Sequence, residues 1–214
     1  MKHIQKFLSD ARTVIGQIDP AAIEKTIDLL ARVREEKGRL FFLGVGGGAA
    51  NASHSVADFR KIGGFEAYTP SDNVAELSAR TNDEGWETGF VEWLKGSRLG
   101  KSDAVFVLSV GGGTPELGLS DNIARAVIYA KSVGAKVLGV VGKDGGLTAR
   151  YADACIIVPT VDPGVVTPYV EAAQSLVVHL MVNHPRLKAF EMKHESLNRA
   201  SLSGRPKKKR HCPQ

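Results

Sequence analysis

The sequence has few of the features that mark membrane, disulfide-rich or cysteine-ligated zinc proteins. Its 214 residues include only two cysteines, Cys155 and Cys212, which excludes a disulfide framework and a zinc ribbon. No apolar run approaches the roughly 18 to 20 residues that a membrane span needs. Residues 1–7 also lack the apolar core of a signal peptide. We therefore expect a soluble cytoplasmic protein in a reducing compartment.

The net charge of +5 does not indicate a nucleic-acid-binding surface. Five of the 28 basic residues lie among the last ten residues, and the other 23 match the 23 acidic residues in number. We expect a neutral body that binds neither nucleic acid nor membrane. The chain divides into one domain over residues 1–202 and a basic tail over 203–214. We expect the tail to be flexible because it has no aliphatic side chain to bury.

The apolar pattern predicts alternating helices and strands. Amphipathic stretches predict helices at 3–15, 21–36, 49–61, 120–133 and 168–182, and short apolar runs predict strands at 40–43, 104–108, 136–141 and 154–158. Alternation of this kind implies parallel strands with right-handed crossovers. The predicted fold is a three-layer α/β/α sandwich preceded by two N-terminal helices.

Two glycine-rich loops each follow a predicted strand and precede a predicted helix. The first spans Gly44–Gly48 and the second spans Ser109–Thr114. Ligands of open parallel sheets bind at the carboxyl ends of the strands, and glycines let backbone N–H groups approach an anion there. A phosphate is the ligand that this pattern favours, and tight turns without a ligand are the alternative for either loop alone. Neither loop is a P-loop, so nucleotide binding is the weaker interpretation.

Titratable side chains lie on two of the predicted helices. His54 and Asp58 are four residues apart and project from one helix face, and Glu171 and His179 lie on the last helix. Such groups can transfer protons or bind a divalent metal such as zinc. Glu171 and His179 are about 12 Å apart along a helix axis, so joint ligation needs a frayed first turn or a second subunit. For His54 and for His179, the alternative is a histidine that only forms hydrogen bonds within a partly buried helix.

A polar segment over 79–86 follows a further predicted helix. We expect a loop in which Asn82 and Asp83 bind sugar hydroxyls. The alternative is an Asx turn in which Asp83 caps the next helix.

From about Leu40 to Val182 the sequence resembles the sugar isomerase (SIS) domain family and, within it, the sedoheptulose-7-phosphate isomerases, also called phosphoheptose isomerases. The resemblance rests on the first glycine loop with His54 and an acid four residues later, Thr81-Asn82-Asp83, residues 109–113, residues 142–146 and the helix with His179. It implies a flavodoxin-like fold with a five-stranded parallel sheet. The implied reaction converts D-sedoheptulose 7-phosphate to D-glycero-D-manno-heptose 7-phosphate, the first step of nucleotide-activated heptose biosynthesis.

The resemblance also implies roles for individual residues. Asp58 and His179 would be the acid and base of a cis-enediol mechanism, and His54, Asp58, Glu171 and His179 would bind a divalent metal, most simply zinc. The residues expected to bind the substrate are Gly46, Gly47, Gly48, Asn51, Asn82, Asp83, Ser109, Gly111, Gly112, Gly113, Thr114, Ser120 and Glu171. The family usually has Glu where this chain has Asp58, Gln where it has Glu171 and more hydroxyl side chains in the second glycine loop.

The resemblance further implies a homotetramer, or at least a dimer, with active sites built from neighbouring subunits. The apolar side chains available for such contacts on the two N-terminal helices are Ile4, Phe7, Leu8, Ile23, Ile27 and Leu30. Packing of these helices on their own sheet is the alternative. Two other functions fit the same fold: a non-catalytic phosphosugar-binding regulatory protein and a hexulose-phosphate isomerase.

Overall fold

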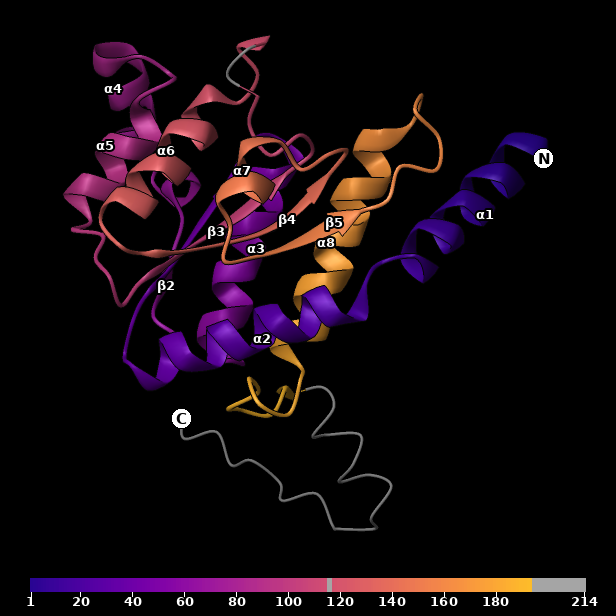
Figure 1. Cartoon of the computed structure of the whole chain (residues 1–214), viewed down its shortest axis with the longest axis horizontal. Coiled ribbons are helices and arrows are strands. Elements are labelled where there is room, and N and C mark those ends of the chain that lie inside the picture. Colours follow the sequence, from indigo (N-terminus) through magenta and orange to yellow (C-terminus); the bar gives the residue numbers. More distant parts are fainter. Residues whose placement is uncertain (115–116, 194–214) are drawn as a thin grey trace, which may run out of the picture.

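A parallel five-stranded sheet forms the middle layer of the protein (Figure 1). The computed structural model describes residues 1–114 and 117–193, so the predicted tail at 203–214 lies outside the described residues. The strands are β1 (Leu40–Gly44), β2 (Ala67–Tyr68), β3 (Ala104–Ser109), β4 (Lys136–Gly142) and β5 (Ala154–Val158), in the order β2-β1-β3-β4-β5. The chain therefore reverses its direction of winding between β1 and β3, and the carboxyl ends of these strands form the topological switch point.

Helices cover both faces of the sheet. One face carries α1 (Lys2–Gly16), α2 (Pro20–Glu35), α3 (Gly47–Lys61) and α8 (Val166–Val182). The other carries α4 (Val74–Glu84), α5 (Gly89–Gly96), α6 (Asp121–Ser132) and α7 (Gly146–Tyr151), with the 3-10 helix η1 (Pro70–Asp72) before α4. The predicted three-layer sandwich is thus confirmed. Within the described ranges, none of these helices combines the length and apolarity required to cross a membrane.

Strand side chains alternate between two apolar cores. Phe42 in β1 faces the core under α2, α3 and α8 and stacks on Phe106 of β3 at 5.2 Å. Phe41 and Leu43 face the opposite core under α5 and α6. Since both faces are covered, the strands are continuous apolar runs, as expected for a parallel sheet. Cys155 of β5 packs at the edge of the second core, and burial raises the pKa of its thiol to about 12, which disfavours the reactive thiolate.

The ends of α2 follow from local sequence. The Asp19 side chain accepts a hydrogen bond from the Ala21 N–H at 2.9 Å, and Pro20 occupies the first helical position. At the other end Lys37 adopts the left-handed conformation, with φ of 57°, and the Gly38 N–H donates to the Val33 carbonyl. A Cβ on Gly38 would lie 1.8 Å from the Ser102 carbonyl oxygen. Glycine is therefore needed at 38 for close backbone approach rather than for its φ.

Glycines also let the loops at the carboxyl edge pack directly on one another. A Cβ on Gly48 would lie 2.3 Å from the Leu108 carbonyl oxygen, so the backbone of the first glycine loop lies directly against β3. Gly112 has φ of 68°, and a Cβ there would lie 2.0 Å from the carbonyl oxygen of Gly145. The Gly112 carbonyl also accepts from the N–H and the hydroxyl of Thr148 at 2.9 and 2.7 Å. These contacts fix the second glycine loop against α7.

We predict that Gly112→Ala lowers the free energy of unfolding by roughly 2 to 4 kcal/mol, because the added Cβ collides with backbone and the left-handed φ disfavours alanine. Gly111 is the matched control: a Cβ there meets nothing within 4 Å. Gly111→Ala should change the stability by no more than about 0.5 kcal/mol. Urea denaturation followed by circular dichroism measures both, and equal effects of the two substitutions would contradict the prediction.

Candidate active site

Helices α3 and α8 lie side by side and run in the same direction. The Asn51 side-chain amide donates to the Glu171 carbonyl at 2.9 Å and to Gln174 Oε1 at 3.0 Å. Gln174 is fully buried and donates in turn to the Val140 carbonyl of β4 at 3.1 Å. Further along both helices, His54 meets His179. This chain of amides ties α8 to α3 and to the sheet, and it sets which residues of the two helices face each other.

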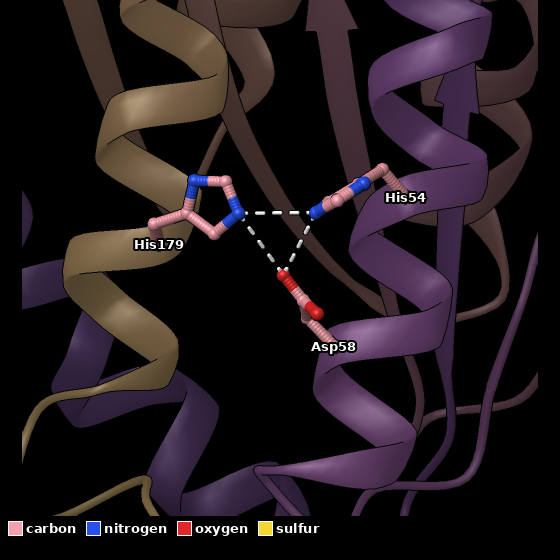
Figure 2. A group of neighbouring side chains, drawn as sticks. All are labelled: His54, Asp58 and His179. Carbon is pink, nitrogen blue, oxygen red and sulfur yellow. Dashed lines mark hydrogen bonds and ion pairs between the residues drawn. The ribbon is translucent and has the colours of Figure 1, made fainter. Parts of the chain in front are cut away.

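Three titratable side chains converge between these helices (Figure 2). The Nε2 atoms of His54 and His179 are 3.0 Å apart. Asp58 Oδ2 lies 3.1 Å from Nε2 of His54 and 3.2 Å from Nε2 of His179. His54 and Asp58 come from consecutive turns of α3, and His179 comes from the second half of α8. The predicted pair on α3 is therefore joined by the histidine of α8.

The geometry of this trio is suited to a shared proton or a bound cation. Asp58 Oδ2 is buried, and although both imidazoles are within ion-pair distance, neither approaches it with hydrogen-bond geometry. Two Nε2 atoms at 3.0 Å can form a hydrogen bond only if one of them carries a proton. Ligands arranged tetrahedrally around zinc lie about 3.3 Å from one another, close to the separations within the trio. The residues present thus fit a divalent metal held by two imidazoles and one carboxylate.

Glu171 lies two turns away from the trio. Its carboxylate is in contact with the first glycine loop, because a Cβ on Gly47 would lie 2.3 Å from the Glu171 carboxyl carbon and 2.4 Å from each of its oxygens. Among the described residues, the group whose ligand atoms lie within 4.8 Å of one another consists of His54, Asp58 and His179. Glu171 is thus placed toward the expected phosphate loops rather than with the trio. The eight-residue spacing of Glu171 and His179 along α8 separates them by about 12 Å, and the parallel packing places Glu171 beside the start of α3.

The first glycine loop has one open position. Gly46 precedes α3 with φ of 59°, and a Cβ there would meet nothing within 4 Å. Gly44 and Gly48 are instead required by close backbone contacts, since a Cβ on Gly44 would lie 2.2 Å from the Gly48 carbonyl oxygen. Only part of this loop is therefore available to a ligand.

The second glycine loop packs against the first turn of α6. The Ser109 hydroxyl is buried and accepts from the Gly112 N–H at 3.0 Å, and Gly113 packs on Ala124 of α6. Gly111 is open. Thr114 pairs with Leu119, and Ser120 precedes α6 in the left-handed conformation, with φ of 53°.

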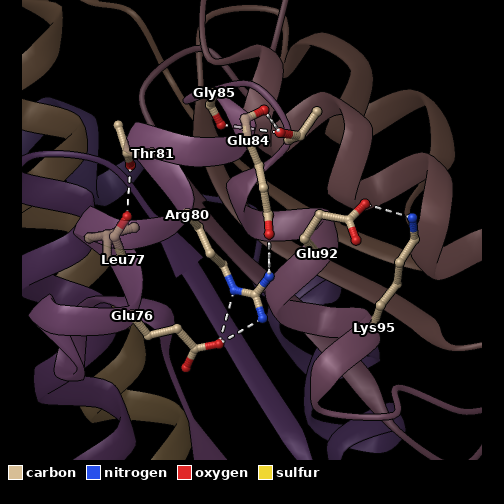
Figure 3. Close-up of polar contacts among 9 residues, drawn as sticks. Glu76, Leu77, Arg80, Thr81, Glu84, Gly85, Glu92 and Lys95 are labelled. Atoms are coloured by element: carbon tan, nitrogen blue, oxygen red, sulfur yellow. Dashed lines mark hydrogen bonds and ion pairs between the residues drawn. The ribbon is translucent and has the colours of Figure 1, made fainter.

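Asn82 and Asp83 lie within α4, which corrects the predicted loop. Helix α4 continues to Glu84 because Arg80 pairs with Glu76 at 2.9 Å and with Glu84 at 3.2 Å, each four residues away (Figure 3). Asp83 does not cap α5, whose N-cap is Thr88. The Asn82 amide instead donates to the Asp83 carboxylate at 2.7 Å. Helix α4 packs against η1 and α5, so within one chain these side chains lie apart from the trio on α3 and α8.

Two buried amides at the site are absent from the residues predicted above. Gln174 links the helices, and its only signal in the sequence is a polar residue in an apolar helix. Asn122 in the first turn of α6 is also fully buried, and its Nδ2 has no hydrogen-bond partner within the described part of the chain. An unpaired buried donor costs about 1 to 3 kcal/mol, so this amide is available to a ligand at the end of the second glycine loop.

The comparisons with known proteins agree with this architecture. No family model matches the chain. A phosphoheptose isomerase from Helicobacter pylori strain P12 is 30% identical over 166 residues, which are 74% of this chain and 80% of the relative. One from Geotalea daltonii is 30% identical over 172 residues, 78% of this chain and 84% of the relative. The structure of phosphoheptose isomerase from Neisseria gonorrhoeae superposes with a TM-score of 0.72 at 22% identity, covering 85% of this chain and 95% of that one.

The fold, with its two glycine loops at the switch point, is that of the sugar isomerase domain enzymes. The sequence relatives narrow this class further. The chain belongs to the phosphoheptose isomerase family and is an aldose–ketose isomerase.

Proposed function

We propose that this chain converts D-sedoheptulose 7-phosphate to D-glycero-D-manno-heptose 7-phosphate, the first step of nucleotide-activated heptose biosynthesis. The observation that carries the proposal is the convergence of His54, Asp58 and His179 in a member of the phosphoheptose isomerase family. A regulatory phosphosugar-binding protein has no need of such a trio. A hexulose-phosphate isomerase would use the same chemistry, and comparing turnover of the two sugar phosphates by purified protein separates these enzymes.

The proposed mechanism transfers protons between C1 and C2 of the ketose. Asp58 takes the C1 proton and returns it to C2, while His179 delivers a proton to the C2 oxygen and receives one from the C1 oxygen, so that a cis-enediol forms and collapses to the aldehyde. The glycine loops, with Ser109, Thr114 and Ser120, hold the phosphate. Binding energy from that remote end then positions the reacting carbons.

The same trio would hold a divalent metal through His54 Nε2, Asp58 Oδ2 and His179 Nε2. Two imidazoles and a carboxylate suit zinc better than magnesium. A metal held there would supply Lewis-acid stabilisation of negative charge on the substrate oxygens. The two roles of His179 are alternatives: with no metal its imidazole transfers protons, and with a metal it would serve as a ligand.

Exposure of the trio supports a site that a second copy of the chain completes. The side chains of His54 and His179 are 59% and 45% exposed, and Leu176 and Leu180 beside His179 are also exposed. Figure 1 shows the N-terminal end of α1 at the edge of the molecule. Ile4 and Leu8 on this helix are more than 60% exposed, whereas Phe7 packs against Tyr169 of α8. Ile27 and Leu30 of α2 pack instead in the chain's own core, as does the partly buried Ile23. Of the predicted subunit contacts, those on α1 thus remain, and the exposed leucines of α8 are an addition that the sequence analysis did not name.

Asp58→Asn and His179→Ala should each lower kcat by about 10² to 10⁴, because each removes a proton-transfer group. Turnover of sedoheptulose 7-phosphate is the measurement, and thermal unfolding verifies that the variants are folded. Glu35→Gln, an exposed change at the end of α2, should retain full activity. Wild-type turnover by either site variant would refute the assigned roles.

Purified protein supplied with zinc should retain about one metal ion per chain, and His54→Ala should retain much less, because it leaves two of three ligands. Elemental analysis gives the stoichiometry, and activity before and after chelation shows whether the metal is needed. Absence of bound metal, together with full activity in chelator, would leave the trio as acids and bases only.

Light scattering should give a particle of two or four times the 22.9 kDa chain mass. Leu8→Glu should shift it toward the monomer and lower the activity, since a buried unpaired charge opposes subunit packing. Ile128, exposed on α6, provides a matched control, and Ile128→Glu should leave the assembly intact. A stable wild-type monomer at micromolar concentration would contradict a shared site.

A further inference from the structure

A cavity of about 450 Å³ lies beside β2, the edge strand of the sheet, and it is separate from the candidate active site. Its lining side chains come from β1, β2, the last turn of α3, η1, α4 and α5. Of the residues that the structure describes, none from the trio or from the two glycine loops lines this cavity. Its volume lies within the roughly 300 to 1,000 Å³ that is typical of sites for small molecules. The cavity is therefore large enough for a ligand of its own.

Three aromatic side chains form one wall of the cavity. Phe41 and Tyr68 stack with ring centroids 6.0 Å apart, and Trp93 meets Phe41 edge-on at 5.6 Å. Phe41 and Trp93 are buried, whereas Tyr68 is 38% exposed. Aromatic side chains of this kind bind planar rings by stacking. The wall thus favours a ligand that contains a flat ring system.

Two charged side chains that line the cavity are already paired. Arg39 forms an ion pair with Asp103 at 2.8 Å, and the Arg39 guanidinium lies over the Phe41 ring. Glu76 forms an ion pair with Arg80 at 2.9 Å. These two pairs contribute no net charge to the cavity, so any preference for a charged ligand depends on the other side chains.

Arg60 and Asp72 also line the cavity, and neither has an oppositely charged partner in the described part of the chain. The Arg60 guanidinium lies 5.7 Å from the Tyr68 ring centroid, a cation–π contact that leaves its charge unpaired. Asp72 Oδ1 accepts a hydrogen bond from the Ser53 hydroxyl at 2.6 Å, which does not neutralise the carboxylate. A ligand that satisfies both groups carries an anion for Arg60 and a hydrogen-bond donor for Asp72.

We propose that this cavity binds a nucleoside monophosphate whose base carries an amino group. The base stacks on Tyr68 and Trp93, the phosphate pairs with Arg60, and the amino group donates to Asp72. A sugar phosphate fits less well, because its several hydroxyls need paired donors and acceptors that an aromatic wall does not supply. The inference goes beyond the proposed function, since it concerns a second site.

The test uses the full chain with Trp86→Phe, which leaves Trp93 as the single tryptophan. AMP is titrated in excess inorganic phosphate, which occupies any phosphate site at the glycine loops, and we expect saturable quenching of Trp93 fluorescence. Arg60→Gln should raise the Kd for AMP by about tenfold or more, because it removes charge-assisted hydrogen bonds to the phosphate. Lys61→Gln is the matched control: it removes the neighbouring exposed charge, which does not line the cavity, and should change the Kd by less than about twofold.

Two further ligands test the individual contacts. Adenosine lacks the phosphate, so the parent protein and Arg60→Gln should bind it equally, which also shows that the cavity of the variant is intact. Inosine monophosphate has an oxo group in place of the amino group and should bind about tenfold more weakly than AMP, because that oxygen would face the Asp72 carboxylate. The proposal is overturned by any of four results: no saturable quenching by AMP, equal AMP affinity of the parent and Arg60→Gln, equal affinity for AMP and inosine monophosphate, or displacement of AMP by an equal concentration of ribose 5-phosphate.

Discussion

The register between α3 and α8 is the constraint on which the rest of the site depends. The partly buried Asn51 and the fully buried Gln174 form a chain of amides that ends on the Val140 carbonyl of β4. Because buried amides must be satisfied, a shift of α8 along α3 would break several hydrogen bonds at once. With that register fixed, His179 meets His54 and Asp58, and Glu171 meets Gly47. The packing of α8 on α3 thus positions both His179 in the trio and the Glu171 carboxylate beside the first glycine loop.

Close backbone packing sets a second constraint at the carboxyl edge of the sheet. Gly44, Gly48 and Gly112 are needed because neighbouring carbonyl oxygens occupy the space of a Cβ, whereas Gly46 and Gly111 face open space. The two interpretations of a glycine loop, a tight turn and an anion site, therefore apply to different residues of the same loop. The close contacts make the loops rigid, and rigidity keeps the open N–H groups in place for a ligand.

The trio combines a buried carboxylate oxygen with two exposed imidazoles. A buried carboxylate oxygen without a hydrogen-bond partner raises the free energy of the folded protein. A proton shared with an imidazole, or a bound cation, would remove this cost, so the trio is suited to bind either. Its exposure in the single chain, together with the exposed apolar side chains on α1 and α8, is the observation on which the proposed subunit assembly depends. Water exclusion by a neighbouring copy would strengthen each electrostatic interaction at the site.

The sequence by itself determined the strands, most of the helices, both glycine loops and the pairing of His54 with Asp58, since all of these depend on local periodicity and spacing. It did not reveal the two-residue strand β2 or the continuation of α4 through Asn82 and Asp83, where Arg80 ion pairs outweigh a polar, loop-like composition. The resemblance implied that His179 joins the α3 pair, but only the tertiary structure showed that contact, separated Glu171 from it and paired Gln174 with Asn51. The physical reason is that helix spacing defines which face a residue lies on, while contacts between segments more than 100 residues apart depend on how those faces pack.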